Sequence, residues 1–214
     1  MTDIRIDIVS DIACPWCAIG YARLEQAMAK VADKYAFSVA WHAFELNPAH
    51  EGQGEPILPA LARKYGRSEE EMRANQDQMM TIARDLGLNF DKMQQRFTCN
   101  TFDAHRLVKW ADEHGRATEM KQALFEAYFG RAEDVSEHPV LLRCVEHVGL
   151  DTARAGDILQ GDEYADVVRK DEATYQQAGV SAVPAFIVNG KYLISGAQEP
   201  ETLVQAFEEI VTNS

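Results

Sequence analysis

Strand patterns occur only near the two ends of this 214-residue chain. Residues 4–9 alternate apolar and polar side chains, and residues 37–44 are rich in β-branched and aromatic side chains. Both patterns are typical of strands. Residues 183–195 contain two short apolar runs around Asn189-Gly190, a pair that predicts a hairpin because a type I′ turn needs positive φ at both central positions. The fold must therefore join the two ends of the chain in one sheet.

Helical patterns fill the rest of the chain. A helix predicted over residues 15–30 separates the first two strands, which favours a parallel pair with a crossover. A loop rich in proline and glycine follows at 48–59. Ser68 and Glu71 then match a capping box that opens a helix ending near Gly87. Further helices are predicted over residues 100–115, 117–130, 138–149, 152–160, 162–178 and 200–211. This order predicts a mixed four-stranded sheet split by a helical insertion.

The charge of the chain limits its partners. It carries 34 acidic and 21 basic residues, a formal net charge of −13, and no basic run. Because nucleic-acid affinity depends on Lys and Arg displacing counterions, we expect no nucleic-acid partner. The amino terminus lacks the basic start and long apolar core of a signal peptide, and no apolar stretch reaches the length of a membrane span. We expect a cytoplasmic protein without a membrane partner, either a monomer or a homodimer.

Two of the four cysteines, Cys14 and Cys17, flank a Pro-Trp pair where the first strand gives way to a helix. Such a pair forms a structural disulfide, half of a zinc site or a reaction centre. Cytosolic reductants would keep a structural disulfide open. A structural zinc ion takes about four ligands, but no second C-x-x-C exists and the six histidines lack ligand spacing, so we expect no metal. The pattern favours a reaction centre, with Cys99 a free thiol and Cys144 in the core.

The position of Cys14 provides a mechanism for redox chemistry. Unpaired N–H groups and the dipole at a helix N-terminus favour a thiolate, which is the nucleophile in thiol–disulfide exchange. Cys17 lies one turn further on, where it can close a disulfide with Cys14 and release a bound partner. Asp11 lies nearby and, if unpaired, would oppose formation of the thiolate.

Three separated motifs resemble the cytosolic FrnE-type oxidoreductases, a group in the DsbA-like branch of the thioredoxin superfamily: "SDIACPWCAIG", "NTFDAHRL" and "GVSAVPAFIVNGKYLISGAQEPETL". The resemblance implies an α/β, thioredoxin-like fold with a large all-helical insertion. Residues 1–47 and 180–214 would form a discontinuous thioredoxin-like domain, and residues 48–179 the helical insertion subdomain.

The resemblance also implies roles for individual residues. Cys14 would be the attacking cysteine and Cys17 the resolving one. Pro184 matches the cis-proline of the family, and Val183 before it would pair through its backbone with an extended substrate. The implied substrates are disulfide-containing proteins or low-molecular-weight thiols. No cofactor is implied besides the redox-active Cys14–Cys17 disulfide, with glutathione as a co-substrate.

A second function stays open at this point. The 2-hydroxychromene-2-carboxylate isomerases and kappa-class glutathione transferases are similar in architecture, typically carry serine at the position of Cys14, and use glutathione. The alternative is therefore glutathione-dependent isomerisation or transfer on an aromatic small molecule, using a single thiol. The presence of both cysteines favours dithiol chemistry.

Three further residues are candidates for substrate binding. Trp16 would form a hydrophobic lip for a peptide, or would pack over the sulfurs. Asn100 and His105 would border the substrate groove, with a neutral His105 relaying protons to Cys14; alternatively, Asn100 caps a helix and His105 packs between layers. The helical spacing of Met72 and Met79 predicts core packing rather than a binding groove.

Overall fold

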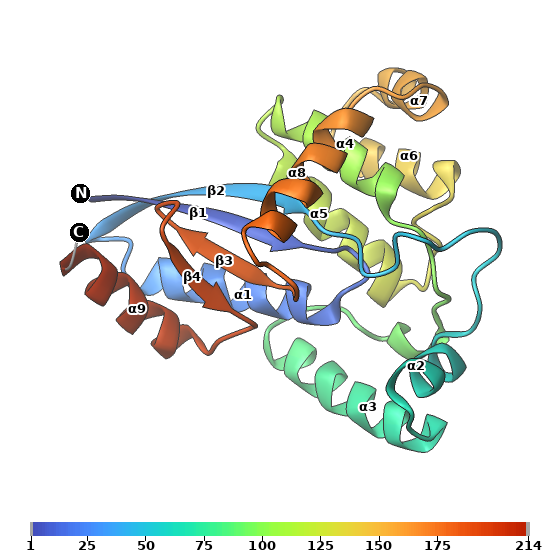
Figure 1. The fold of residues 1–214 in the computed structure, drawn as a ribbon, viewed down its shortest axis with the longest axis horizontal. Helices are drawn as coiled ribbons and strands as arrows, with labels where there is room; N and C mark the ends of the chain where they lie inside the picture. Colours follow the sequence, from blue (N-terminus) through green and yellow to red (C-terminus); the bar gives the residue numbers. More distant parts are fainter. Residues whose placement is uncertain (1, 213–214) are drawn as a thin grey trace.

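The structure, a computed structural model, describes residues 2–212. Within this range, one sheet is formed by β1 (Thr2–Ser10), β2 (Tyr35–Ala43), β3 (Ala185–Val188) and β4 (Tyr192–Ser195), in the order β2-β1-β3-β4. β1 and β2 are parallel, whereas β3 is antiparallel to both β1 and β4 (Figure 1). The two ends of the chain thus meet in the mixed four-stranded sheet that the patterns predict.

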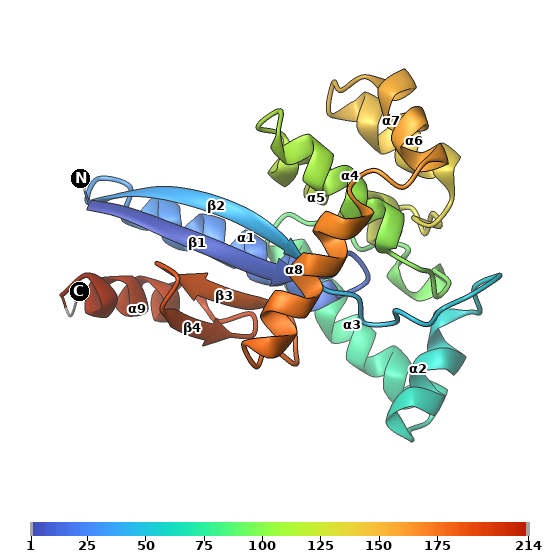
Figure 2. The ribbon, with the colours of Figure 1, turned by 45° about the horizontal axis from the view of Figure 1, so that its top comes forward.

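Helices cover both faces of this sheet. α1 (Pro15–Lys30) and α9 (Pro200–Thr212) lie on one face (Figure 2). Side chains alternate along a strand, so Ile6 and Ile8 of β1 join the core with these helices, whereas Val9 points to the opposite face. α8 (Ala165–Gln177) packs against β2 on that opposite face.

The segment between β2 and β3 is helical, and its last helix is α8. In the described range, no helix combines the length and the apolarity that a membrane crossing requires. A 3-10 turn occupies Met93–Gln95, and α5 continues into a π turn at Glu126–Gly130. The other helices are α2 (Ile57–Tyr65), α3 (Glu69–Asp85), α4 (Phe102–Asp112), α5 (Ala117–Phe125), α6 (His138–His147) and α7 (Thr152–Gln160).

The sheet and the insertion share one hydrophobic core. A single cluster of buried apolar side chains includes Ile6 of β1 and Leu124 of α5. The strands all fall within the predicted 1–47 and 180–214 segments, and α2 to α8 fall within 48–179. Because the core is continuous, the division into two domains follows the topology and stays a prediction.

Local sequence signals are confirmed at two places and wrong at two others. The capping box of Ser68 is present, and φ is positive at both hairpin positions, 52° at Asn189 and 66° at Gly190. α2, however, begins inside the predicted loop, because Pro59 falls in the first helical turn, where a proline N–H is not needed. The N-cap position of α4 is Thr101 rather than Asn100, although Asn100 Oδ1 accepts the N–H of Phe102, the first helical residue, at 2.8 Å.

Candidate active site

The end of β1 places Cys14 at the N-terminus of α1. The strand stops at Ser10, and the helix begins at Pro15 after a short turn. Cys14 is the N-cap residue, in an extended conformation (φ −93°, ψ 111°), and Pro15 takes the first helical position, where its missing N–H costs nothing. No acidic side chain lies in the first turn of α1, so the positive end of the helix dipole acts on Cys14 unopposed there.

The two sulfurs of the C-x-x-C pair differ in proton affinity. The Cys17 thiol donates a hydrogen bond to Cys14, and the N–H groups of Cys17 and Trp16 add to it; together they lower the pKa of Cys14 against the effects of burial and of the Asp11 charge. Burial, together with the donated hydrogen bond, raises the pKa of Cys17 well above its usual value. The geometry therefore favours a Cys14 thiolate beside a protonated Cys17.

The loop before β3 lies against the cysteine pair. The Val183–Pro184 peptide bond is cis, the isomer that the resemblance implies. Val183 O lies 3.6 Å from Cys14 Sγ. Gly20 permits this close packing, because a Cβ there would come within 3.0 Å of Pro184 Cγ and 3.2 Å of Phe186 Cζ. The structure thus brings Cys14, Val183 and Pro184 together.

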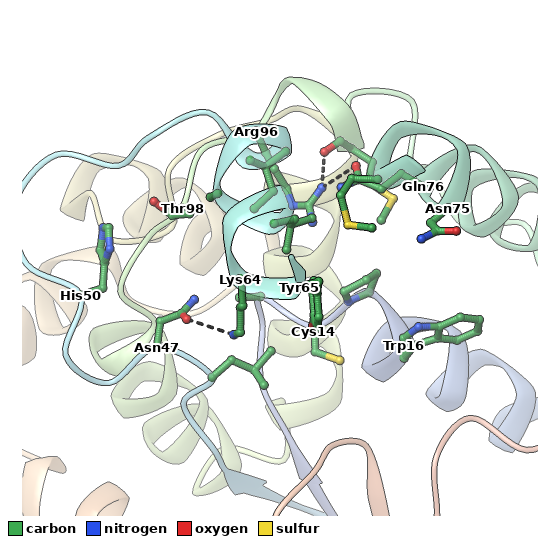
Figure 3. A pocket seen from close by; sticks show the side chains of 18 of the residues that line it. Cys14, Trp16, Asn47, His50, Lys64, Tyr65, Asn75, Gln76, Arg96 and Thr98 are labelled. Atoms are coloured by element: carbon green, nitrogen blue, oxygen red, sulfur yellow. Dashed lines mark hydrogen bonds between the residues drawn. The ribbon is translucent and has the colours of Figure 1, made fainter. Parts of the chain in front are cut away.

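A cavity of about 1120 Å³ opens beside Cys14 (Figure 3). Cys14, Trp16 and Val183 line one side of it, and α2, α3 and residues 93–98 of the insertion line the other. Trp16 is 38 % exposed and Tyr65 of α2 is 61 % exposed. The insertion therefore surrounds the reactive sulfur with a pocket large enough for a small ligand, for which about 300–1,000 Å³ is usual.

Asn100 and His105 lie elsewhere, so the expectation that they border the substrate groove is corrected. Neither is among the described residues that line the cavity. Asn100 Nδ2 donates to Glu45 Oε2 at 3.2 Å. His105 is 2 % exposed, with Nε2 3.1 Å from Phe44 O and 3.4 Å from Asp11 Oδ1. Both side chains are held between the insertion and the sheet. For His105 this matches the alternative given above, in which it packs between layers.

Asp11 connects the end of β1 to the loop after β2. Its Oδ2 accepts the Leu46 N–H at 2.8 Å. Burial works to raise the pKa of Asp11, but the hydrogen bond from His105 and the Leu46 N–H lower it overall. Burial lowers the pKa of His105, and because both neighbours of Nε2 are acceptors, the neutral ring carries its proton there. Asp11 thus stays ionised, and its charge opposes the Cys14 thiolate even though it is hydrogen-bonded.

Lys121 is a site residue that the sequence analysis missed. It is 1 % exposed on α5, and its Nζ lies 5.2 Å from the centre of the Trp41 ring and 5.4 Å from that of Phe125. Burial lowers its pKa to about 8, while the charges of the site cysteines act to raise it. The available signal was a lysine within the buried face of α5, four residues before Phe125.

The other cysteines are buried free thiols of a different kind. Burial raises the pKa of Cys99 to about 12 and that of Cys144 to about 11. Among residues 2–212, no group of three or more His, Cys, Asp or Glu side chains is arranged to hold a metal ion. Of the four cysteines, Cys14 alone has a lowered pKa.

Comparison with known proteins identifies the family and the fold. The family described as DSBA-like thioredoxin domain matches residues 5–208. The crystal structure of a probable DsbA oxidoreductase from Streptomyces coelicolor is 34 % identical, with a TM-score of 0.92 over 99 % of this chain and 91 % of that one. The same fold occurs at 15 % identity in a 2-hydroxychromene-2-carboxylate isomerase (TM-score 0.70, 98 % and 97 % covered) and at 17 % in the cytosolic disulfide reductase DsbM from Pseudomonas aeruginosa (0.68, 98 % and 100 %). The predicted thioredoxin-like fold is confirmed, and the chain belongs to the family of DSBA-like thioredoxin domains.

Proposed function

We propose that this protein is a thiol–disulfide oxidoreductase with Cys14 as the nucleophile and Cys17 as the resolving cysteine. The observation that carries the proposal is the Cys14 sulfur itself: it lines a cavity, and it accepts hydrogen bonds from the Cys17 thiol and from N–H groups of the first helical turn. Membership of a family of DsbA-like oxidoreductases supports the same chemistry.

The reaction proceeds by two displacements. The Cys14 thiolate attacks one sulfur of a substrate disulfide, and the substrate S–S bond breaks as the mixed disulfide forms and the first substrate thiolate leaves. Cys17 then loses its proton and attacks Cys14 Sγ, which expels the second substrate thiolate. The positive charge of Lys121 acts to lower the pKa of Cys17 and so favours this step. Two electrons move from the protein dithiol to the substrate, and the reverse sequence oxidises a substrate dithiol.

The substrates proposed are disulfide-containing proteins and low-molecular-weight thiols. The loop of Val183 and Pro184 beside Cys14 offers backbone groups to an extended chain, and Trp16 offers an apolar contact at the cavity rim. Glutathione is the proposed recycling thiol, since a structure of DsbM with GSH shares this fold. We further propose a cytoplasmic location, where such a thiol pool is available.

An equilibrium redox titration against glutathione tests the proposal. The Cys14–Cys17 couple is expected to pass through one two-electron transition, measured by quenching with an alkylating reagent and counting free thiols by mass spectrometry. A dithiol that stays reduced at every accessible potential would show that the pair is not a redox centre.

A second candidate function is favoured by the large cavity, because Cys14 is the one cysteine among the described residues that line it. A glutathione-dependent isomerase or transferase for an aromatic small molecule needs room for both ligands and needs no resolving cysteine. Cys17→Ser separates the two functions: disulfide exchange should collapse, whereas transfer or isomerisation should persist. Cys144→Ala, which alters a core cysteine, is the matched control and should leave both activities in place.

A further inference from the structure

Arg96 is a buried guanidinium at the cavity wall, directly after the 3-10 turn of the insertion. It is 3 % exposed, and its Nη1 donates to Met93 O and, at 3.3 Å, to Gln76 Oε1. Its Nε has no hydrogen-bond partner. Its Cζ lies 5.3 Å from the centre of the Tyr128 ring and 5.2 Å from that of Phe129. The groups that most favour its charge are Tyr128, Cys99 and Cys14, and no carboxylate is among them. A buried cation without a carboxylate partner is unfavourable unless something else neutralises it.

Gln76 of α3 adds a second donor without a partner. The side chain is 1 % exposed, and because its Oε1 accepts from Arg96, its Nε2 is turned away and makes no hydrogen bond. Both residues line the cavity that holds Cys14. Figure 3 shows the two side chains meeting on the same wall of this pocket. Buried donors without partners are costly, and a ligand oxygen would satisfy both.

The charge around the cavity points to the same kind of ligand. The chain as a whole is acidic, with a net charge of −13. Among the described residues that line the cavity, however, the basic ones outnumber the acidic ones: Arg63, Lys64, Arg67 and Arg96 stand against Glu55. Glu55 is already paired with Arg63. A basic cavity in an acidic protein concentrates anions next to the reactive sulfur.

We propose that Arg96 and Gln76 form a carboxylate subsite, so that the enzyme prefers low-molecular-weight disulfides that carry a carboxylate. This inference rests on the proposed function. The Nε of Arg96 and the Nε2 of Gln76 donate to the ligand carboxylate, and the planar guanidinium suits the two carboxylate oxygens. The disulfide of the same molecule then reaches Cys14 across the cavity, and the exchange proceeds by the two displacements given above.

The test compares two disulfides that differ in charge and are closely matched in shape, 3,3′-dithiodipropionic acid and 3,3′-dithiodipropionamide. The second-order rate constant for oxidation of the reduced protein is measured for each. In Arg96→Gln we expect the constant for the diacid to fall about 10- to 100-fold, and that for the diamide to change less than about threefold. Gln76→Glu keeps the guanidinium but supplies an internal carboxylate, so it should give the same selective loss. Arg84→Gln, on the exposed side of α3 and not among the residues that line the cavity, is the control and should change neither constant more than about threefold.

Three results would overturn the inference. An unchanged rate with the diacid would show that no such subsite exists. An equal loss for both disulfides, with a raised Cys14 pKa, would assign Arg96 to the thiolate instead of to the substrate. If Arg96→Gln does not fold, Gln76→Glu decides alone, and an equal effect on both compounds counts against the subsite. A wild-type protein that reacts with neither compound would overturn the proposed function itself, which distinguishes that failure from loss of the subsite.

Discussion

Cys14 and Cys99 are similarly buried, at 5 % and 3 % exposed, yet their pKa values shift in opposite directions. Cys99 precedes α4, and burial raises its pKa to about 12. Cys14 begins α1, and its pKa is lowered because the Cys17 thiol and two backbone N–H groups donate to its sulfur. The difference shows that the donors around a sulfur, rather than its exposure, set its reactivity.

The same contrast holds for two buried carboxyl groups beside the site. Asp11, 1 % exposed, has a lowered pKa because N–H donors surround it. Glu45 is 6 % exposed, and burial together with the neighbouring carboxyl of Glu172 raises its pKa to about 7. This occurs although Arg169 Nη1 lies 2.7 Å from Glu45 Oε1. In both regions, the neighbours decide which protonation state the fold favours.

The largest expected effect is on alkylation of the two sulfurs. At pH 7, iodoacetamide should modify Cys14 at least about 1000-fold faster than Cys99 in the native reduced protein, because a thiol with a pKa of about 12 is almost never ionised. Mass spectrometry of the cysteine peptides measures both rates, and in urea they should converge. Equal alkylation rates in the native protein would contradict the opposite pKa shifts of Cys14 and Cys99.

Glu45→Gln tests the contrast between the carboxyl groups of Asp11 and Glu45. It should change the equilibrium constant for unfolding by about 30-fold. Because the folded-state pKa of Glu45 is raised, its stabilising contribution is present below about pH 4.5 and is lost as the pH rises through about 7. The variant should avoid this loss and gain about 2 kcal/mol over the wild type between pH 5 and pH 8. Urea unfolding at both pH values measures it. Glu70→Gln, on the exposed face of α3, should follow the wild type, and a Glu45 variant that does the same would contradict the assignment.

Asp11→Asn should make the Cys14 thiolate easier to form. The charge of Asp11 acts to raise the pKa of Cys14, so its removal should lower that pKa, while Asn still accepts the Leu46 N–H. Thiolate absorbance at 240 nm against pH measures the change. Asp7→Asn, in β1 four residues before Asp11, is the control and should leave the titration of Cys14 in place. A rise in the Cys14 pKa in the Asp11 variant would show that the Asp11 charge does not oppose the thiolate.

The site residues that could be predicted from the sequence lie in short local motifs. Cys14, Trp16 and Cys17 share one helical turn, and Val183-Pro184 opens a strand, so local patterns and a family resemblance were enough to find them. The parallel crossover and the hairpin followed in the same way, because alternation and turn signals are local.

The residues that the sequence missed come from the insertion. Periodicity shows that one face of a helix is apolar, but not whether a cavity also meets that face. Met72 and Met79 pack in the core as expected, and they line the cavity as well. Arg96 carries no local signal for a buried charge, and Lys121 has only its place on the buried face of α5, because the charged groups around both come from distant parts of the chain. Tertiary packing alone determines their roles.

The smallest effect on the sulfur is expected from His105→Ala, which decides whether His105 acts on Cys14 or only on Asp11. His105 donates to Asp11 and to Phe44 O, so its loss should move the Cys14 pKa by less than about 0.3 unit. It should reduce the free energy of unfolding by about 1–3 kcal/mol, because buried acceptors lose their donor. His138→Ala, on an exposed histidine paired with Asp103, controls for loss of an imidazole and should change neither quantity measurably. If the rate of disulfide exchange falls while the free energy of unfolding is unchanged, His105 relays protons. If the free energy of unfolding falls while the Cys14 titration is unchanged, His105 positions Asp11. In that case the Cys14 thiolate depends on the N-terminus of α1 and on Cys17.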